Sequence, residues 1–367
     1  MAENAGANFL LANNGEMVAV ISDDGSNNGT VEFVVGHLEE EGEEAHEGEE
    51  HEQPELRDLS VTGTGVKVVN TNGHFSVLAG GATQLVPYAS LEEGEAPEKE
   101  PLGLTFAGTE NYPAFLLEET TSEKVALGFD GVTAKVYENT GSGFSSEGTS
   151  FTCDSVKSAV HTSTSTGEGD AKVAVAEIIV VSCDNSGTDV NYVVKLVHEG
   201  EAISASALNI STPVDWKVRA GVFVGLGEDD QFYVAEVNEA GNDVVLEGDA
   251  FIKPTGMCDE AWGIDSTNAD IFTLTASELA VHEHDGSETV ALTLDESPNA
   301  TCADLSIATA NQAVFVLDNS ASKLYEIDKE EGATLYHIHG REDLSVSDVA
   351  SAVSFHEVGS EGSHEHH

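Results

Sequence analysis

Three histidines stand in a strongly acidic stretch near the N-terminus. His37, His46 and His51 share residues 37–52 with nine glutamates. Neutral imidazole nitrogens suit Zn²⁺, Cu²⁺ and Ni²⁺, and carboxylates complete a ligand shell around such ions. The stretch lacks the spaced Asp, Asn and Gly ligands of a calcium loop. We therefore predict a divalent-metal site, with zinc as the ion and these histidines and Glu47 as ligands; the alternative is a solvated acidic loop with incidental histidines.

Other patterns that carry chemistry are weaker or absent. Two pairs, His282/His284 and His337/His339, each place both rings on one face of an extended strand, which is more typical of a half-exposed strand than of a site. The histidine-containing tail, residues 358–367, is expected to be disordered and to bind transition metals loosely. The sequence contains no G-x-S-x-G, Walker A or H-E-x-x-H motif, so we expect no enzyme.

The elements that would position such a site are short β-strands. Segments rich in Val, Phe, Thr and Leu alternate with Gly, Asn and Asp turns, and helical periodicity is scarce. A unit of two apolar strands and a polar turn recurs about every 40 to 60 residues, a period typical of propeller blades. The seven copies span residues 8–21, 75–86, 124–137, 178–196, 222–234, 271–281 and 313–327.

Four segments that precede these units are predicted to be inner strands. They are residues 65–69, 155–160, 261–264 and 305–308. The first unit has no such predecessor, and residues 349–355 can supply it, which would close the ring and remove exposed sheet edges.

The predicted fold is therefore all-β, a seven-bladed β-propeller closed by N- and C-terminal strands. It forms a single domain over residues 1–357, with an acidic and histidine-containing loop inserted at 37–56. A two-domain β-sandwich is the alternative.

The propeller geometry suggests further metal ligands. If the acidic loop linked the outer strand of one blade to the inner strand of the next, it would overhang one mouth of the central channel. The approaches to other inner strands carry Glu110, Asp154, Asp259 and Asp304, so a ring of carboxylates would face the loop. We predict Asp154, Asp259 and Asp304 as additional ligands; the alternative is that they are turn residues before strands.

Charge and cysteine content bound the compartment and the partners. The formal net charge of −53 disfavours nucleic acid and anionic membranes, and favours cations and basic partners. The four cysteines include no C-x-x-C motif, and their even number and wide spacing fit two disulfides in an oxidising compartment. Sequence order favours Cys153–Cys183 and Cys258–Cys302, although three pairings are possible. No signal peptide is visible, so export is inferred from the cysteines and composition.

With these features in place, the chain resembles the AztD family of periplasmic zinc metallochaperones. The resemblance rests on the seven units, on the histidine and acid segment after the first strand pair, and on Cys153 and Cys183 around one inner strand. It implies a propeller that hands zinc to the solute-binding protein of a zinc ABC importer. The family tends to carry histidines at the channel entrances of several blades. The corresponding stretches here, 65–67, 112–114 and 155–157, contain none.

Three functional hypotheses follow from the sequence. The first is a periplasmic or extracellular zinc-binding protein of the metallochaperone type, which we expect to be a monomer. The second is an acidic propeller module that docks a basic protein without metal and weakens with salt. The third is a propeller enzyme with a channel metal, for which the sequence shows no convincing set of ligands.

Overall fold

The computed structural model is all-β, in agreement with the predicted fold class. It describes residues 9–13, 17–23, 28–35, 55–91, 96–104, 110–119, 124–139, 144–166, 173–186, 188–198, 202–219, 221–258, 261–264, 270–276, 278–282, 288–293, 301–302, 305–309, 313–318, 323–329, 336–341 and 353–355. Within these ranges the one helical element is a 3₁₀ turn, Tyr88–Ser90. No helix there is long and apolar enough to cross a membrane.

The described strands form seven sheets, which we name A to G in chain order. Sheet A contains β1 (Phe9–Asn13), β2 (Met17–Asp23), β3 (Asn28–Val35), β4 (Glu55–Thr64) and the C-terminal β29 (Val353–Phe355). Sheet B contains β5 (Lys67–Thr71), β6 (His74–Ala79), β7 (Ala82–Pro87) and β8 (Glu100–Pro101). Sheet C contains β9 (Phe115–Glu119), β10 (Lys124–Phe129), β11 (Thr133–Asn139) and β12 (Phe144–Thr152).

The other four sheets continue the same pattern. Sheet D contains β13 (Ser155–Thr166), β14 (Val173–Asp184), β15 (Val190–Val197) and β16 (Ala202–Leu208). Sheet E contains β17 (Val214–Arg219), β18 (Val222–Gly227), β19 (Gln231–Val237) and β20 (Val244–Ile252). Sheet F contains β21 (Trp262–Ile264), β22 (Ile271–Leu274), β23 (Glu278–His282) and β24 (Glu288–Thr293). Sheet G contains β25 (Leu305–Thr309), β26 (Ala313–Asp318), β27 (Lys323–Lys329) and β28 (Tyr336–Arg341).

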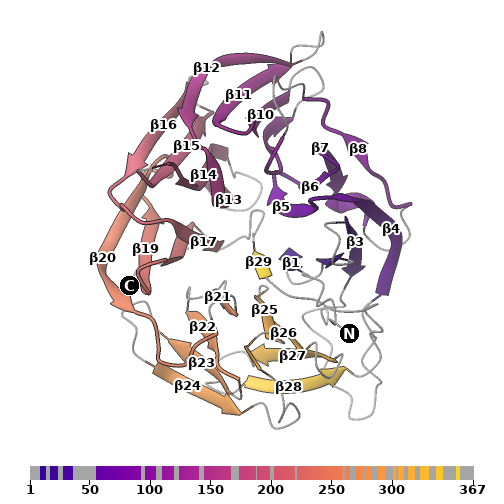
Figure 1. The fold of residues 1–367 in the computed structure, drawn as a ribbon, viewed down its shortest axis with the longest axis vertical. Coiled ribbons are helices and arrows are strands. Elements are labelled where there is room, and N and C mark those ends of the chain that lie inside the picture. Colours follow the sequence, from indigo (N-terminus) through magenta and orange to yellow (C-terminus); the bar gives the residue numbers. More distant parts are fainter. Residues whose placement is uncertain are drawn as a thin grey trace.

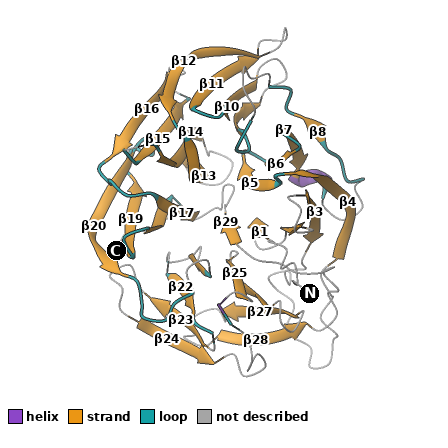
Figure 2. Ribbon diagram, viewed as in Figure 1, coloured by secondary structure: helices purple, strands orange, loops and turns teal. Residues whose placement is uncertain are grey.

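The sheets stand around a common centre, and consecutive strands within each sheet pair antiparallel (Figure 1). The first strands of six sheets, β1, β5, β13, β17, β21 and β25, lie nearest the centre, and the outer strands form the rim (Figure 2). β29 lies at the centre and pairs with β1 in parallel, with Leu10 opposite Val353. The seven predicted two-strand units all fall on neighbouring strands of one sheet.

The strand order refines the sequence prediction in two places. β1 is already the first of four consecutive strands in sheet A, so the C-terminal strand is a fifth strand and not a replacement for a missing one. The predicted inner strands correspond to β5, β13, β21 and β25, whereas β9 and β17 were not predicted. Val214–Arg219 alternates apolar and charged residues, a pattern typical of a strand with one buried face.

Neighbouring sheets pack face to face through apolar clusters. One cluster joins sheets C and D and includes Phe115, Phe129, Ile179 and Val181. Others join D to E and E to F, the latter around Trp262. Strands such as β14 and β18 read as nearly continuous apolar runs because both of their faces are covered.

A lysine is buried where sheets E and F meet. The Lys217 side chain on β17 is 1 % exposed, and its Nζ donates a hydrogen bond to the Trp262 carbonyl on β21. The same ammonium group lies 4.5 Å from the centroid of the Trp262 ring. A buried cation thus obtains both a carbonyl acceptor and a cation–π contact, which offset its desolvation.

Close packing in sheet E predicts a specific cost for one added methyl group. A Cβ at Gly225 would overlap Val214 and lie 2.7 Å from Trp216 Cε3, both on the neighbouring strand β17. We expect Gly225→Ala to lower the free energy of unfolding by about 2 kcal/mol, since an overpacked core must shift its neighbours. Gly148→Ala is the control, because a Cβ there meets nothing within 4 Å. Equal urea midpoints for the two variants would show that Val214 and Trp216 can move away from the added methyl group without loss of stability.

Candidate functional site

The connection that carries the acidic segment differs from the one expected. Residues 36–54 lie outside the described residues, but both of their ends are fixed by strands. Val35, the last residue of β3, pairs with Glu55, the first residue of β4. The segment therefore joins the third and fourth strands of sheet A and does not link one sheet to the next. We expected the acidic segment to lead to the inner strand of the next blade. That expectation was wrong, because β1 is already the first strand of sheet A and the segment leads to β4 of the same sheet.

This connection separates two groups of predicted ligands. β4 runs from the segment to Thr64, and two residues then lead into β5. Its ten residues cover about 30 Å at the usual rise of an extended strand. Asp154 lies between β12 and β13, at the kind of entry that leads from an outer strand to the next inner one. The acidic segment begins and ends at one end of sheet A, whereas the connections from one sheet to the next lie at the opposite end. The described strands therefore do not support the prediction that the segment and Asp154 face the same mouth of the channel.

Most of the predicted ligands lie outside the described residues. These are His37, His46, His51, Glu47, Asp259 and Asp304, and their assignment stays a prediction. The described part of the chain contains no group of three or more His, Cys, Asp or Glu side chains placed to hold a metal ion.

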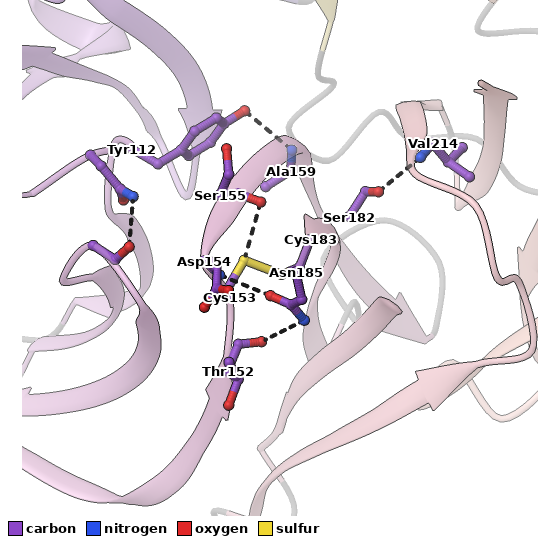
Figure 3. Close-up of a disulfide and its surroundings, with 12 residues drawn as sticks. Tyr112, Thr152, Cys153, Asp154, Ser155, Ala159, Ser182, Cys183, Asn185 and Val214 are labelled. Atoms are coloured by element: carbon purple, nitrogen blue, oxygen red, sulfur yellow. Dashed lines mark hydrogen bonds between the residues drawn. A yellow bond between two sulfur atoms is a disulfide. The ribbon is translucent and has the colours of Figure 1, made fainter. Parts of the chain in front are cut away.

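Asp154 is the one predicted ligand that the structure describes, and it is held in a turn (Figure 3). Its Oδ2 accepts a hydrogen bond from the Ser186 backbone N–H at 3.1 Å, and its own N–H donates to Asn185 Oδ1 at 2.8 Å. The adjacent Cys153–Cys183 disulfide joins the connection between β12 and β13 to the end of β14. These contacts match the alternative interpretation of Asp154 as a turn residue before a strand.

Both cysteine pairings favoured by sequence order are present. Cys153 bonds Cys183, and Cys258 bonds Cys302. The first bond is buried in the cluster between sheets C and D. The second joins the residues that precede β21 and β25, and Cys302 is exposed. One bond therefore ties the connection between sheets C and D to sheet D, and the other joins the residues that lead into sheets F and G.

A small acidic pocket adjoins the Asp154 turn. Its volume is about 430 Å³, and its lining residues are Asp184, Asn185, Ser186, Thr188, Asp189 and Ser211. Partial burial and the neighbouring Asp184 carboxylate raise the pKa of Asp189 above its ordinary value. The pocket therefore concentrates negative charge on the entry side of sheets D and E.

The inner strands carry lysine where the resembled family tends to carry histidine. Lys67, at the start of β5, donates to the Asn111 carbonyl and lies 5.1 Å from the centroid of the Tyr112 ring. Burial lowers the pKa of the Lys67 amine. Lys157 on β13 forms an ion pair of 3.0 Å with Glu228. Lys67 and Lys157 thus place amino groups at these two positions, where histidine would have provided imidazole ligands for a metal ion.

Glu110 does not line a channel mouth as the sequence suggested. Its carboxylate is 5 % exposed and accepts hydrogen bonds from the Thr83 backbone N–H at 2.9 Å and the Thr83 hydroxyl at 2.6 Å. Thr83 lies on β7, the third strand of sheet B, whose partner β8 has only two residues. Glu110 thus satisfies a backbone donor that a longer outer strand would otherwise bond.

Sheet D contains a buried ionisable cluster that the sequence pattern did not predict. The Glu177 carboxylate on β14 accepts hydrogen bonds from His161 Nε2 at 2.7 Å and from Ser163 Oγ at 2.6 Å, both on β13. His198, just after β15, places its Nε2 at 3.5 Å from the other carboxylate oxygen. A signal was present, since Glu177 is a charge inside the apolar run of β14, between Ala176 and Ile178.

Comparison with solved structures supports a β-propeller. The chain is similar to apo AztD from Citrobacter koseri, with 15% sequence identity, coverage of 88% of this chain and 82% of that chain, and a TM-score of 0.52. It is also similar to the Cps50 (Swd1) β-propeller domain of Myceliophteria thermophila, at 11% identity, 88% and 96% coverage and a TM-score of 0.49. Sqt1 from Saccharomyces cerevisiae matches at 13% identity, 94% and 89% coverage and a TM-score of 0.47. No protein-family model and no curated protein sequence matches the chain.

The likeness to AztD concerns the fold. At 15% identity, similar backbones carry little information about which side chains form a site. The arrangement of sheets A to G and the two disulfides is therefore supported by the structure. The chemistry of the acidic segment is argued from its own residues.

Proposed function

We propose that the chain is an exported, seven-bladed β-propeller whose ring is closed by its two termini. Seven sheets within the described residues and the parallel pairing of β29 with β1 support this arrangement. The two disulfides support a periplasmic or extracellular location, since such bonds persist in oxidising compartments.

The proposed function is divalent-metal binding, with Zn²⁺ as the ion. The carrying observation is the composition of residues 37–52, with three histidines and nine glutamates, on a connection between two paired strands. Neutral His37, His46 and His51 would supply nitrogen ligands, and Glu47 would supply a carboxylate. Because protonation removes the imidazole lone pair, affinity falls as the pH drops below about 6.5. The resemblance to the AztD family extends the proposal to delivery of zinc to the solute-binding protein of an ABC importer.

A second candidate function is an acidic interaction module for a basic protein. The pocket beside Asp184 and Asp189 and the net charge of −53 favour it. Such binding would need no metal and would weaken steeply with salt, because exposed charges are screened.

Calorimetric titration with zinc at neutral pH separates the two candidates. We expect the intact chain to bind zinc stoichiometrically, and the triple variant H37A/H46A/H51A to lose more than about 100-fold in affinity. The matched control is H364A/H366A/H367A, which removes the same number of histidines from the C-terminal tail. If tight binding persists in H37A/H46A/H51A and disappears in the tail variant, the zinc ligands are the histidines of the C-terminal tail. Weak zinc binding in all three proteins would contradict the metal-binding function and favour the acidic interaction module.

A further inference from the structure

A buried carboxylate lies between two histidines where sheet D meets sheet C. Glu177 is 4 % exposed and His161 is fully buried. His161 Nε2–H and the Ser163 hydroxyl both donate to Glu177 Oε2. The Nε2 atom of His198 is buried, lies 3.5 Å from Glu177 Oε1 and has no hydrogen-bond partner in the described part of the chain.

Sheet C supplies the other side of this cluster. The Phe115 ring on β9 lies 6.5 Å from the His161 ring, centroid to centroid. The pairing of β9 with β10 shifts register between Val125 and Ala126, and this leaves Leu117 as an extra residue before Glu118. Such a bulge redirects the side chains that follow it. Glu118 lies opposite Val125, which belongs to the apolar cluster between sheets C and D. From this face the half-buried Glu118 carboxylate favours the charged form of His198.

The charges around His198 come from three strands. Glu177 faces it from β14, Glu118 from β9, and His161 shares the Glu177 carboxylate from β13. A carboxylate removed from water needs a nearby cation, because desolvation penalises its charged form. A protonated His198 supplies a cation between carboxylates of two different sheets, whereas a neutral His198 leaves Glu177 with His161 and Ser163 alone.

We propose that His198, with Glu177 and His161 in sheet D and Glu118 in sheet C, forms a proton-dependent clamp between these two sheets. The clamp is strongest in mildly acidic solution and weakens as the pH rises. It is independent of the proposed metal function, because none of its residues belongs to the acidic segment.

The directions of the pKa shifts agree with this geometry. The Glu177 carboxylate, with a smaller effect of Glu118, raises the pKa of His198 above its ordinary value of 6.5. That contribution to stability is present below pH 6.5 and is lost as the pH rises through the raised pKa. Burial acts to raise the pKa of Glu177, but its contacts with His161, His198 and Ser163 lower it below 4.5. That second contribution is lost only as the pH falls through the lowered value.

The first measurement is an NMR titration of the His198 imidazole in the full-length protein. We expect a midpoint above 6.5, a lower midpoint in Glu118→Gln, and a still lower one in Glu177→Gln. Glu119→Gln is the matched control, since Glu119 is the next residue of β9 and forms its ion pair with Lys124. A midpoint at or below 6.5, or one that Glu118→Gln leaves unchanged, would overturn the clamp. Glu118→Gln decides the matter even if Glu177→Gln fails to fold, because Glu118 is half-buried.

The second measurement is amide hydrogen exchange at pH 6 and pH 8, corrected for the intrinsic exchange rate. We expect β9 and β14 to lose protection at pH 8 relative to β18, which lies in sheet E. Equal changes in all three strands would indicate general loosening by the negative surface and would contradict a clamp between sheets C and D.

Discussion

The double variant Cys153→Ala/Cys183→Ala is expected to lose about 4–5 kcal/mol in the free energy of unfolding. The bond closes a loop with a sequence separation of 30 residues, and loop-closure entropy alone accounts for about 3–4 kcal/mol of this loss. Both sulfurs also lie in the apolar cluster between sheets C and D, with Cys153 2 % exposed and Cys183 fully buried. Their removal adds a packing defect of about 1 kcal/mol. Denaturant unfolding under oxidising conditions measures the sum.

The second disulfide provides a matched comparison. Cys258 and Cys302 are 44 residues apart, so loop entropy alone makes their bond slightly more stabilising than the first. Because Cys302 is exposed, its removal leaves a smaller defect in the core. We expect Cys258→Ala/Cys302→Ala to cost less than Cys153→Ala/Cys183→Ala. The reverse order would mean that burial of the first bond adds nothing beyond loop closure.

The periodic pattern of the sequence was sufficient to predict an all-β chain of repeated sheets. Apolar strands such as β6, β10 and β18 are short and recur along the chain, and turn residues mark their ends. The pattern was insufficient for the first sheet, because three strands before the acidic segment, β1, β2 and β3, share one sheet with β4, which follows it. Connectivity depends on which strands pair, and single-chain periodicity does not contain that information.

The candidate site was predictable only in its composition. Clustered histidines and glutamates can be recognised by residue type, so residues 37–52 stand out in the sequence, and their role as a metal site stays a prediction. Proximity to a strand start does not show where a carboxylate points: Asp154 is bonded in a turn, and Glu110 is buried against Thr83. The cluster around Glu177 is assembled from three strands and becomes visible only once β13, β14 and β15 are paired.

The pH dependence of stability should carry the signature of one buried carboxyl group, Glu110. Burial raises its pKa from 4.5 to about 7, although two hydrogen bonds from Thr83 act in the opposite direction. A raised pKa in the folded state means that the contribution is present below pH 4.5 and is lost as the pH rises through about 7. The shift corresponds to about 3 kcal/mol between these limits.

The variant Glu110→Gln isolates this contribution, because its amide is neutral throughout and can still accept a hydrogen bond from Thr83. We expect the wild type to lose stability relative to Glu110→Gln as the pH rises from 5 to 8, by up to about 3 kcal/mol in urea unfolding. Acid also relieves repulsion among the many surface carboxylates, but this effect is common to both proteins and cancels in the difference. Glu228→Gln, a change at an exposed ion pair with Lys157, is the control and should show a flat difference. A difference that is equally flat for Glu110→Gln would mean that water reaches the Glu110 carboxylate and that β7 does not depend on it as a substitute for a longer outer strand.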